Sequence, residues 1–147
     1  MRTIKFRAKV KMPEKRNFAR QEYVPEGQWV YGEPHTIDCP TPHIHTADVG
    51  KQPIDKETVG QFTGLIDKNG KEIYEGDIVK IKTLQGIVTW HPNGYFCIHT
   101  YKCDISEVSY TAIGDMVDYF HKDLYDDGLE VVGNTYENPD LLKGGAK

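Results

Sequence analysis

The sequence predicts a mainly β fold with minor α content: an N-terminal antiparallel strand pair or arm, followed by a small antiparallel barrel or roll with one short helix. Two observations predict it. Apolar and basic residues alternate over residues 4–11, as in a half-buried strand. From residue 58 onwards, short apolar runs alternate with turn sequences rich in glycine, asparagine and aspartate. We therefore divide the chain into an arm with a long loop, residues 1–57, and a barrel domain, residues 58–147.

The predicted arm consists of two strands and a loop. The first strand covers residues 4–10, and the second covers residues 29–31, which lie between two glycine- and proline-containing turn sequences. We expect these strands to pair. Residues 34–53 contain several prolines and almost no apolar periodicity, so we expect them to form a long loop.

The predicted barrel is built on a meander of short strands joined by tight turns. The sequence Asp-Lys-Asn-Gly at 67–70 precedes it, and its Asn-Gly step suits a tight turn. Met116, Val117, Phe120 and Leu124 share one side of the short helix, which we expect near residues 115–124. A helical turn is expected over residues 138–142. The expected strands cover residues 78–82, 87–90, 95–102 and 129–132.

Composition limits the class of protein. The 147 residues, 38% of them hydrophobic, suffice to bury a core without metal or disulfide support. The longest apolar stretches are only a few residues, far short of the roughly 20 that cross a bilayer. Residues 1–11 offer no apolar signal core. The chain has an odd number of cysteines, Cys39, Cys97 and Cys103, which favours free thiols over a framework of disulfides. We expect a soluble, cytoplasmic protein with no membrane partner.

Charge is distributed unevenly along the chain, whose net charge is −4. Residues 1–20 contain eight basic residues against Glu14 alone, whereas residues 104–140 contain ten acidic residues against Lys122 alone. The two ends can therefore pair with each other, within one subunit or between subunits, or face different partners. We favour pairing within the chain.

Four segments together resemble the YopX-like family of bacteriophage and prophage proteins. They read IKFRA at 4–8, VGQFTGL at 59–65, DKNGKEIYEGDIV at 67–79, and EVVGN at 130–134 with YENP at 136–139. They span nearly the whole chain in the family's order. The resemblance implies a phage accessory protein with an SH3-like barrel in its C-terminal part. It implies neither an agreed molecular activity nor catalytic residues.

The residues of the shared segments are those that turns and strands need, rather than those of a catalytic site. Gly70, Gly76 and Gly133 stand where chain reversals or close backbone approaches are needed, and Asp77 can hydrogen-bond the turn before a strand. A functional interpretation is also open. In it, Tyr74, Glu75 and Asp77 form a partner-binding patch at the mouth of the barrel.

Two clusters contain residue types that bind metal ions. One lies in the expected loop and consists of His35, Cys39, His43 and His45. The other is Cys97 with His99, which alternation places on the outward face of a strand whose Phe96 and Ile98 face the core. Neither cluster has the close spacing of common zinc sites, so we expect no bound metal and no other cofactor.

Catalytic motifs are weak. The two serines, Ser106 and Ser109, lie outside any G-x-S-x-G elbow, and no phosphate-binding G-x4-G-K-[ST] loop occurs. Cys97 and His99 lie on one strand with no evident third group to orient a base. We do not expect an enzyme.

The first hypothesis is therefore a non-enzymatic phage accessory protein that binds a phage or host protein, or itself as a homo-oligomer. The alternative is a nucleic-acid-binding module in which the first strand contacts phosphates and nearby aromatic side chains stack on bases. The low pI of about 5.8 and the acidic C-terminal third oppose it. Its binding residues are Arg2, Lys5, Arg7, Lys9 and Lys11.

Overall fold

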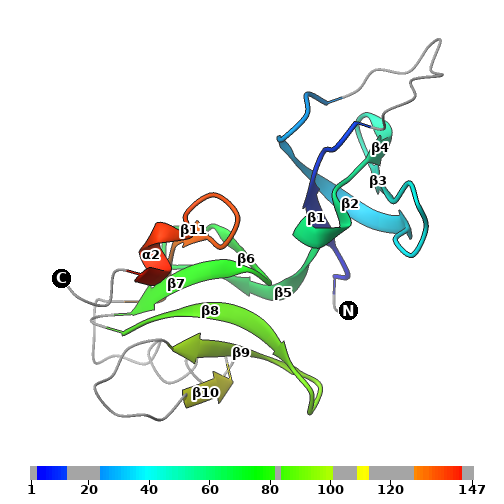
Figure 1. Ribbon diagram of the computed structural model, residues 1–147. Helices are drawn as coiled ribbons and strands as arrows, with labels where there is room; N and C mark the ends of the chain where they lie inside the picture. The colour runs from blue at the N-terminus through cyan, green and yellow to red at the C-terminus, as the bar shows by residue number, and fades with distance from the viewer. Residues whose placement is uncertain (1–2, 13–23, 82–83, 101–108, 113–127, 144–147) are drawn as a thin grey trace. The chain divides into compact units, whose positions relative to one another are not determined.

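The computed structural model describes residues 3–12, 24–81, 84–100, 109–112 and 128–143 (Figure 1). The chain divides into two compact units, Met1–Phe62 and Thr63–Lys147. We call them the N-terminal and C-terminal units and describe each by itself. The mainly β class predicted from the sequence is confirmed, because helix is confined to single turns among the described residues.

The first sheet has six strands in the order β4-β3-β2-β1-β5-β6, of which β4 to β1 and the start of β5 belong to the N-terminal unit. Pairing of the first two strands is confirmed, with Arg7 opposite Tyr31 and Lys9 opposite Trp29. A 3-10 turn, η1 (Lys56–Thr58), precedes β5. The strands are β1 (Phe6–Lys9), β2 (Trp29–Thr36), β3 (His43–Thr46), β4 (Gly50–Pro53) and the start of β5 (Gly60–Ile66).

The prediction of a long loop over residues 34–53 is wrong, because β2 extends into it and β3 and β4 lie within it. Both new strands have only four residues, too few for alternation to stand out from the surrounding prolines. Pro53 is the last residue of β4, a strand at the end of the sheet order where proline is tolerated.

The N-terminal sheet curls around its own apolar core. The backbone beyond β4 returns to β1 through a bridge between Val10 and Ile54, and Asp55 N–H donates to the Lys9 carbonyl at 2.9 Å. Gln52 is fully buried, but its amide accepts from Val24 N–H at 2.9 Å and donates to the Val49 carbonyl at 3.1 Å. Burial of this polar group is therefore compensated. The buried core consists of Ala8, Val10, Val30, Ile44 and Ile54.

The C-terminal unit contains the predicted meander. Its five-stranded antiparallel sheet has the order β10-β9-β8-β7-β11, and the β5–β6 pair contributes Leu65 and Ile73 to the same core. Among the described strands, β10 and β11 are the two ends of this sheet, so the predicted barrel is not closed. The helix expected at 115–124 lies outside the described residues, whereas the predicted final helical turn is confirmed as α2 (Asp140–Lys143). The remaining strands are β6 (Glu72–Tyr74), β7 (Asp77–Ile81), β8 (Leu84–His91), β9 (Tyr95–Thr100), β10 (Ser109–Ala112) and β11 (Glu130–Asn134).

Buried carboxylates organise the turns of this unit. Asp67 is 5% exposed, and its Oδ1 accepts from Asn69 and Lys71 N–H, both at 2.8 Å. Its Oδ2 accepts from Val131 N–H at 3.0 Å, which ties the turn to β11. Asp77 Oδ2 likewise accepts from Tyr74 N–H at 2.8 Å.

The three glycines named in the shared segments have the predicted roles. Gly70 and Gly76 have φ +81° and +88°, in the left-handed region that favours glycine. At Gly133 a Cβ atom would lie 2.6 Å from Asn138 Oδ1, and that oxygen accepts from Asn134 N–H. Turn geometry and close backbone packing therefore explain these glycines.

Replacing the Asp67 carboxylate is expected to destabilise the C-terminal unit. Asp67→Ala leaves three backbone N–H groups without their acceptor, so we expect a loss of about 2–4 kcal/mol in the free energy of unfolding. Urea unfolding followed by circular dichroism measures it. Asp67→Asn, which keeps the shape and one acceptor oxygen, should lose less. A change below about 0.5 kcal/mol for Asp67→Ala would contradict this role.

Candidate functional site

The N-terminal unit carries a group of cations and aromatic rings that we call the cation–aromatic face: Lys5, Arg7, Lys9, Trp29 and Tyr31. The Arg7 guanidinium carbon lies 4.5 Å from the centroid of the Trp29 ring, and Lys9 Nζ lies 5.4 Å from it. Lys5 Nζ lies 5.6 Å from the centroid of the Tyr31 ring. Each distance is within the range of a cation–π interaction.

Strand pairing brings these five side chains together. Residues 5, 7 and 9 alternate with the apolar core residues of the first strand, and Trp29 and Tyr31 do the same on the second. Arg7 is only 4% exposed, whereas Tyr31 is 44% exposed. Arg7 lies on the basic face of the strand as predicted, but it is covered there, with the indole of Trp29 against its guanidinium.

The other predicted phosphate-binding residues lie elsewhere. Lys11 is exposed and lines a hollow described below, and Arg2 lies outside the described residues. Most of the acidic segment 104–140 also lies outside them, so the proposed pairing of the two chain ends stays a prediction.

The cation–aromatic face continues along the sheet. Glu33, two residues after Tyr31 on β2, lies opposite His45 on β3, and His45 lies opposite Lys51 on β4. All three are exposed. Asp55 N–H donates to the Lys9 carbonyl, and the Asp55 carboxylate accepts from Glu57 N–H.

The predicted patch of Tyr74, Glu75 and Asp77 is placed in the turn between β6 and β7. Tyr74 is 2% exposed and Asp77 is 1% exposed, and Glu75 is half-buried. The Tyr74 hydroxyl donates to Glu72 Oε2 at 2.7 Å. Tyr74 and Asp77 are therefore largely covered, and Asp77 accepts a hydrogen bond from the backbone of this turn, while the partner-binding role of the three residues stays a prediction.

The first histidine and cysteine cluster is spread over two strands and the segment between them. His35 lies on β2, His43 and His45 lie on β3, and Cys39 lies in between. Within the described ranges, no three His, Cys, Asp or Glu side chains come together as metal ligands would. The absence of a bound metal stays a prediction for solution analysis.

The expectation that Cys97 projects outwards is wrong. Phe96, Cys97 and Ile98 are 6%, 0% and 2% exposed, so β9 is buried on both faces at this point. Alternation distinguishes the two faces of a strand but does not say whether the second is covered. Cys97 Sγ lies 3.3 Å from Thr89 Oγ1, and His99 is half-buried.

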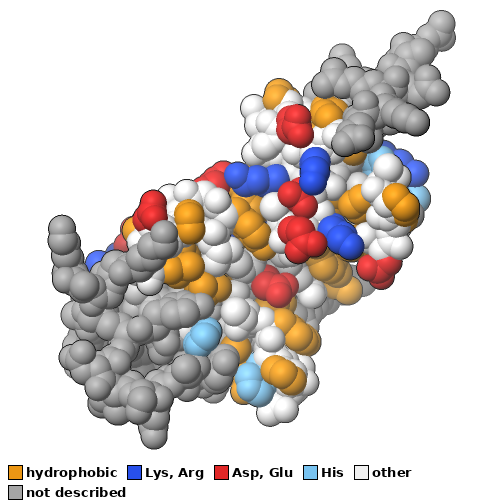
Figure 2. Space-filling model, in the orientation of Figure 1, with side chains coloured by type: hydrophobic (Ala, Val, Ile, Leu, Met, Phe, Trp, Pro, Cys, Tyr) orange, Lys and Arg blue, Asp and Glu red, His pale blue; other side chains and the backbone are white. Residues whose placement is uncertain are grey.

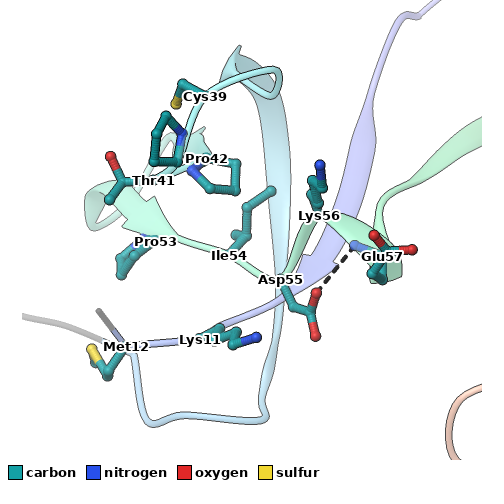
Figure 3. A pocket seen from close by; sticks show the side chains of 11 residues that line it. Lys11, Met12, Cys39, Thr41, Pro42, Pro53, Ile54, Asp55, Lys56 and Glu57 are labelled. Carbon is teal, nitrogen blue, oxygen red and sulfur yellow. Dashed lines mark hydrogen bonds between the residues drawn. The ribbon is translucent and has the colours of Figure 1, made fainter. Parts of the chain in front are cut away.

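Two further features were missed by sequence reasoning. The first is a hollow of about 640 Å³ in the N-terminal unit (Figure 3). Charged side chains of Asp55, Lys56 and Glu57 lie on one side of it, and Pro42 and Pro53 lie on the other. Its lining comes from three separate segments, residues 11–12, 39–42 and 53–57, which no single motif could have connected.

The second feature is the exposed end of the β8–β9 hairpin, which we call the aromatic tip: Trp90, His91 and Tyr95. Trp90 packs edge-on against Phe96 with the centroids 4.7 Å apart, and the rings of His91 and Tyr95 stack at 4.6 Å. Trp90 is 44% and Tyr95 37% exposed. Figure 2 shows hydrophobic side chains on the visible surface of this unit. The sequence indicated only a turn at this position.

Burial predicts different reactivity for the two described thiols. A brief pulse of iodoacetamide on the native protein should modify half-buried Cys39 and spare Cys97. The modification of Cys97 should be on the order of 100-fold slower, because its thiol becomes accessible only when the structure opens locally. Peptide mass spectrometry measures the two sites separately. In urea both should react alike. Equal labelling in the native protein would contradict the placement of Cys97.

Comparison with known proteins gives a family for the chain. No curated protein matches the sequence. In the described residues, no helix is long and apolar enough to span a membrane. The YopX protein family matches residues 5–143, a range that includes both strands of the cation–aromatic face, the aromatic tip and the turns held by Asp67 and Asp77. Since the match covers most of the chain, the protein belongs to the YopX family.

Proposed function

We propose that this chain is a non-enzymatic accessory protein of a bacteriophage or prophage that acts in the host cytoplasm by binding proteins. The first partner is a second copy of the chain, and a phage or host protein is the alternative. The observation that carries the proposal is the aromatic tip, where paired rings are exposed at the end of a hairpin.

The aromatic tip has the chemistry of a protein-binding surface. Tryptophan and tyrosine dominate the energetics of many interfaces, because each buries a large area while losing little conformational freedom. Trp90 and Tyr95 are already held by contacts to Phe96 and His91, so less side-chain ordering remains to be lost on binding. Their exposed fractions leave surface for a partner to cover.

The use of the shared polar residues in turns supports a binding role over a chemical one. Asp67 and Asp77 accept hydrogen bonds from backbone N–H groups. Asn134 does the same, accepting from Tyr136 and Glu137 N–H at 3.0 and 2.9 Å. These side chains hold turns within the segments that resemble the family.

The self-association proposed here rests on aromatic contacts rather than on an open strand edge. The first strand, β1, is paired with β2 on one side and with β5 on the other, so its own chain covers both edges. Apolar contacts between tips resist salt, whereas contacts between the basic and acidic ends of the chain weaken as salt screens them. Salt dependence therefore separates the two mechanisms.

We expect the protein to form dimers or larger oligomers at both low and high salt. The variants Trp90→Ser and Tyr95→Ser should each weaken self-association by about tenfold or more, as loss of an interface anchor does. Light scattering over a concentration series measures this. Ile66→Ser is the matched control, since Ile66 is 55% exposed in the same unit but lies outside the tip.

Each outcome decides one point. A monomer at every concentration and salt would contradict self-association. Oligomers that dissociate only at high salt, and that the tip variants leave intact, would assign the contact to the charged chain ends instead. Thermal unfolding of each variant checks that Trp90→Ser does not act by destabilising its contact with Phe96.

A further inference from the structure

We propose that the cation–aromatic face of the N-terminal unit binds single-stranded nucleic acid. This site is separate from the aromatic tip and does not depend on the function proposed for it. It rests on the contacts of Lys5, Arg7, Lys9, Trp29 and Tyr31 within one curled sheet.

Among the described residues, cations outnumber carboxylates on this face. Lys5, Arg7 and Lys9 lie on it, and Lys51 and Glu33 lie farther along the same sheet. The chain as a whole carries a net charge of −4. A local excess of positive charge on an acidic protein favours an anionic partner at this place.

The aromatic rings select a nucleic acid over other anions. Trp29 and Tyr31 stand on alternate residues of one strand, roughly 7 Å apart along it, with a cation beside each ring. Stacking rings combined with a cationic surface are the two components by which sheet proteins hold single strands. An acidic peptide or polyphosphate uses the cations and has no bases to stack.

The same geometry favours a single strand over a duplex. Bases in a duplex are stacked on one another, so their flat faces are not available to the exposed ring of Tyr31. Lys5 and Lys9, which are half-buried, flank the rings and supply charge where the phosphates next to a stacked base need it. Arg7, which is nearly fully buried, positions Trp29 instead of contacting the ligand.

The test uses the full chain and fluorescently labelled oligonucleotides of mixed sequence, as single-stranded DNA, single-stranded RNA and duplex DNA. Anisotropy titrations at low and physiological salt should show tighter binding of the single strands than of the duplex. Tyr31→Ala should weaken single-strand binding at least about fivefold, the loss expected for one stacked base. The double variant Lys5→Gln/Lys9→Gln should weaken it further and lower the salt slope by about two.

Matched controls separate specific from general effects. Lys71→Gln/Lys80→Gln removes two exposed cations from the C-terminal unit and should leave the affinity unchanged. Trp90→Ser should also leave it unchanged, so failure of the tip proposal and failure of this one are distinguishable. Circular dichroism checks that Tyr31→Ala and Lys5→Gln/Lys9→Gln stay folded.

Three results would overturn the proposal. One is the absence of binding at low salt. The second is binding that Tyr31→Ala does not change and that heparin displaces as readily as an oligonucleotide, which would indicate a general polyanion or acidic-protein surface. The third is an equal loss in the Lys71→Gln/Lys80→Gln control, which would place the contact outside this face.

Discussion

The C-terminal unit depends on the burial of the Asp67 carboxylate. Its two oxygens accept hydrogen bonds from three backbone N–H groups, two in the turn after β5 and one at the start of β11. Val131 is far from Asn69 and Lys71 in the sequence, so one side chain fixes both a local turn and the position of a distant strand. The buried core residues Ile73 on β6, Val131 on β11 and Leu129, just before β11, lie next to the groups that this contact holds. A carboxylate exposed to water would not hold these two segments together in this way, because water would compete for its hydrogen bonds.

Sequence reasoning succeeded where local chemistry decides the structure. Turn sequences such as Asp67–Gly70 and Glu75–Asp77 require particular backbone angles and particular acceptors, and these are properties of adjacent residues. Prediction from the sequence failed where burial or strand formation depends on residues that are distant in the sequence and pack against the segment. The second face of β9 is covered at Cys97, and Ile44 on β3 and Ile54, just after β4, are buried in the core of the N-terminal unit.

The candidate sites follow the same division. Alternation correctly placed Lys5, Arg7 and Lys9 on one side of a strand, and it placed Trp29 and Tyr31 nearby. It did not reveal that a ring lies over each cation, nor that Arg7 is covered, because diagonal contacts between strands depend on their register. The aromatic tip escaped notice because the turn at its end, marked by Pro92-Asn93-Gly94, explains the local sequence without reference to the rings beside it.

The two tryptophans of the chain lie in different units, Trp29 in the N-terminal unit and Trp90 in the C-terminal one. Each indole is partly buried and contacts a distinct neighbour, the Arg7 guanidinium in one case and the Phe96 ring in the other. The tryptophan emission of the protein therefore comes from two probes, one in each unit. Replacing either indole with phenylalanine leaves a chain whose intrinsic fluorescence follows one unit at a time, so the order in which the units melt can be recorded without an added dye.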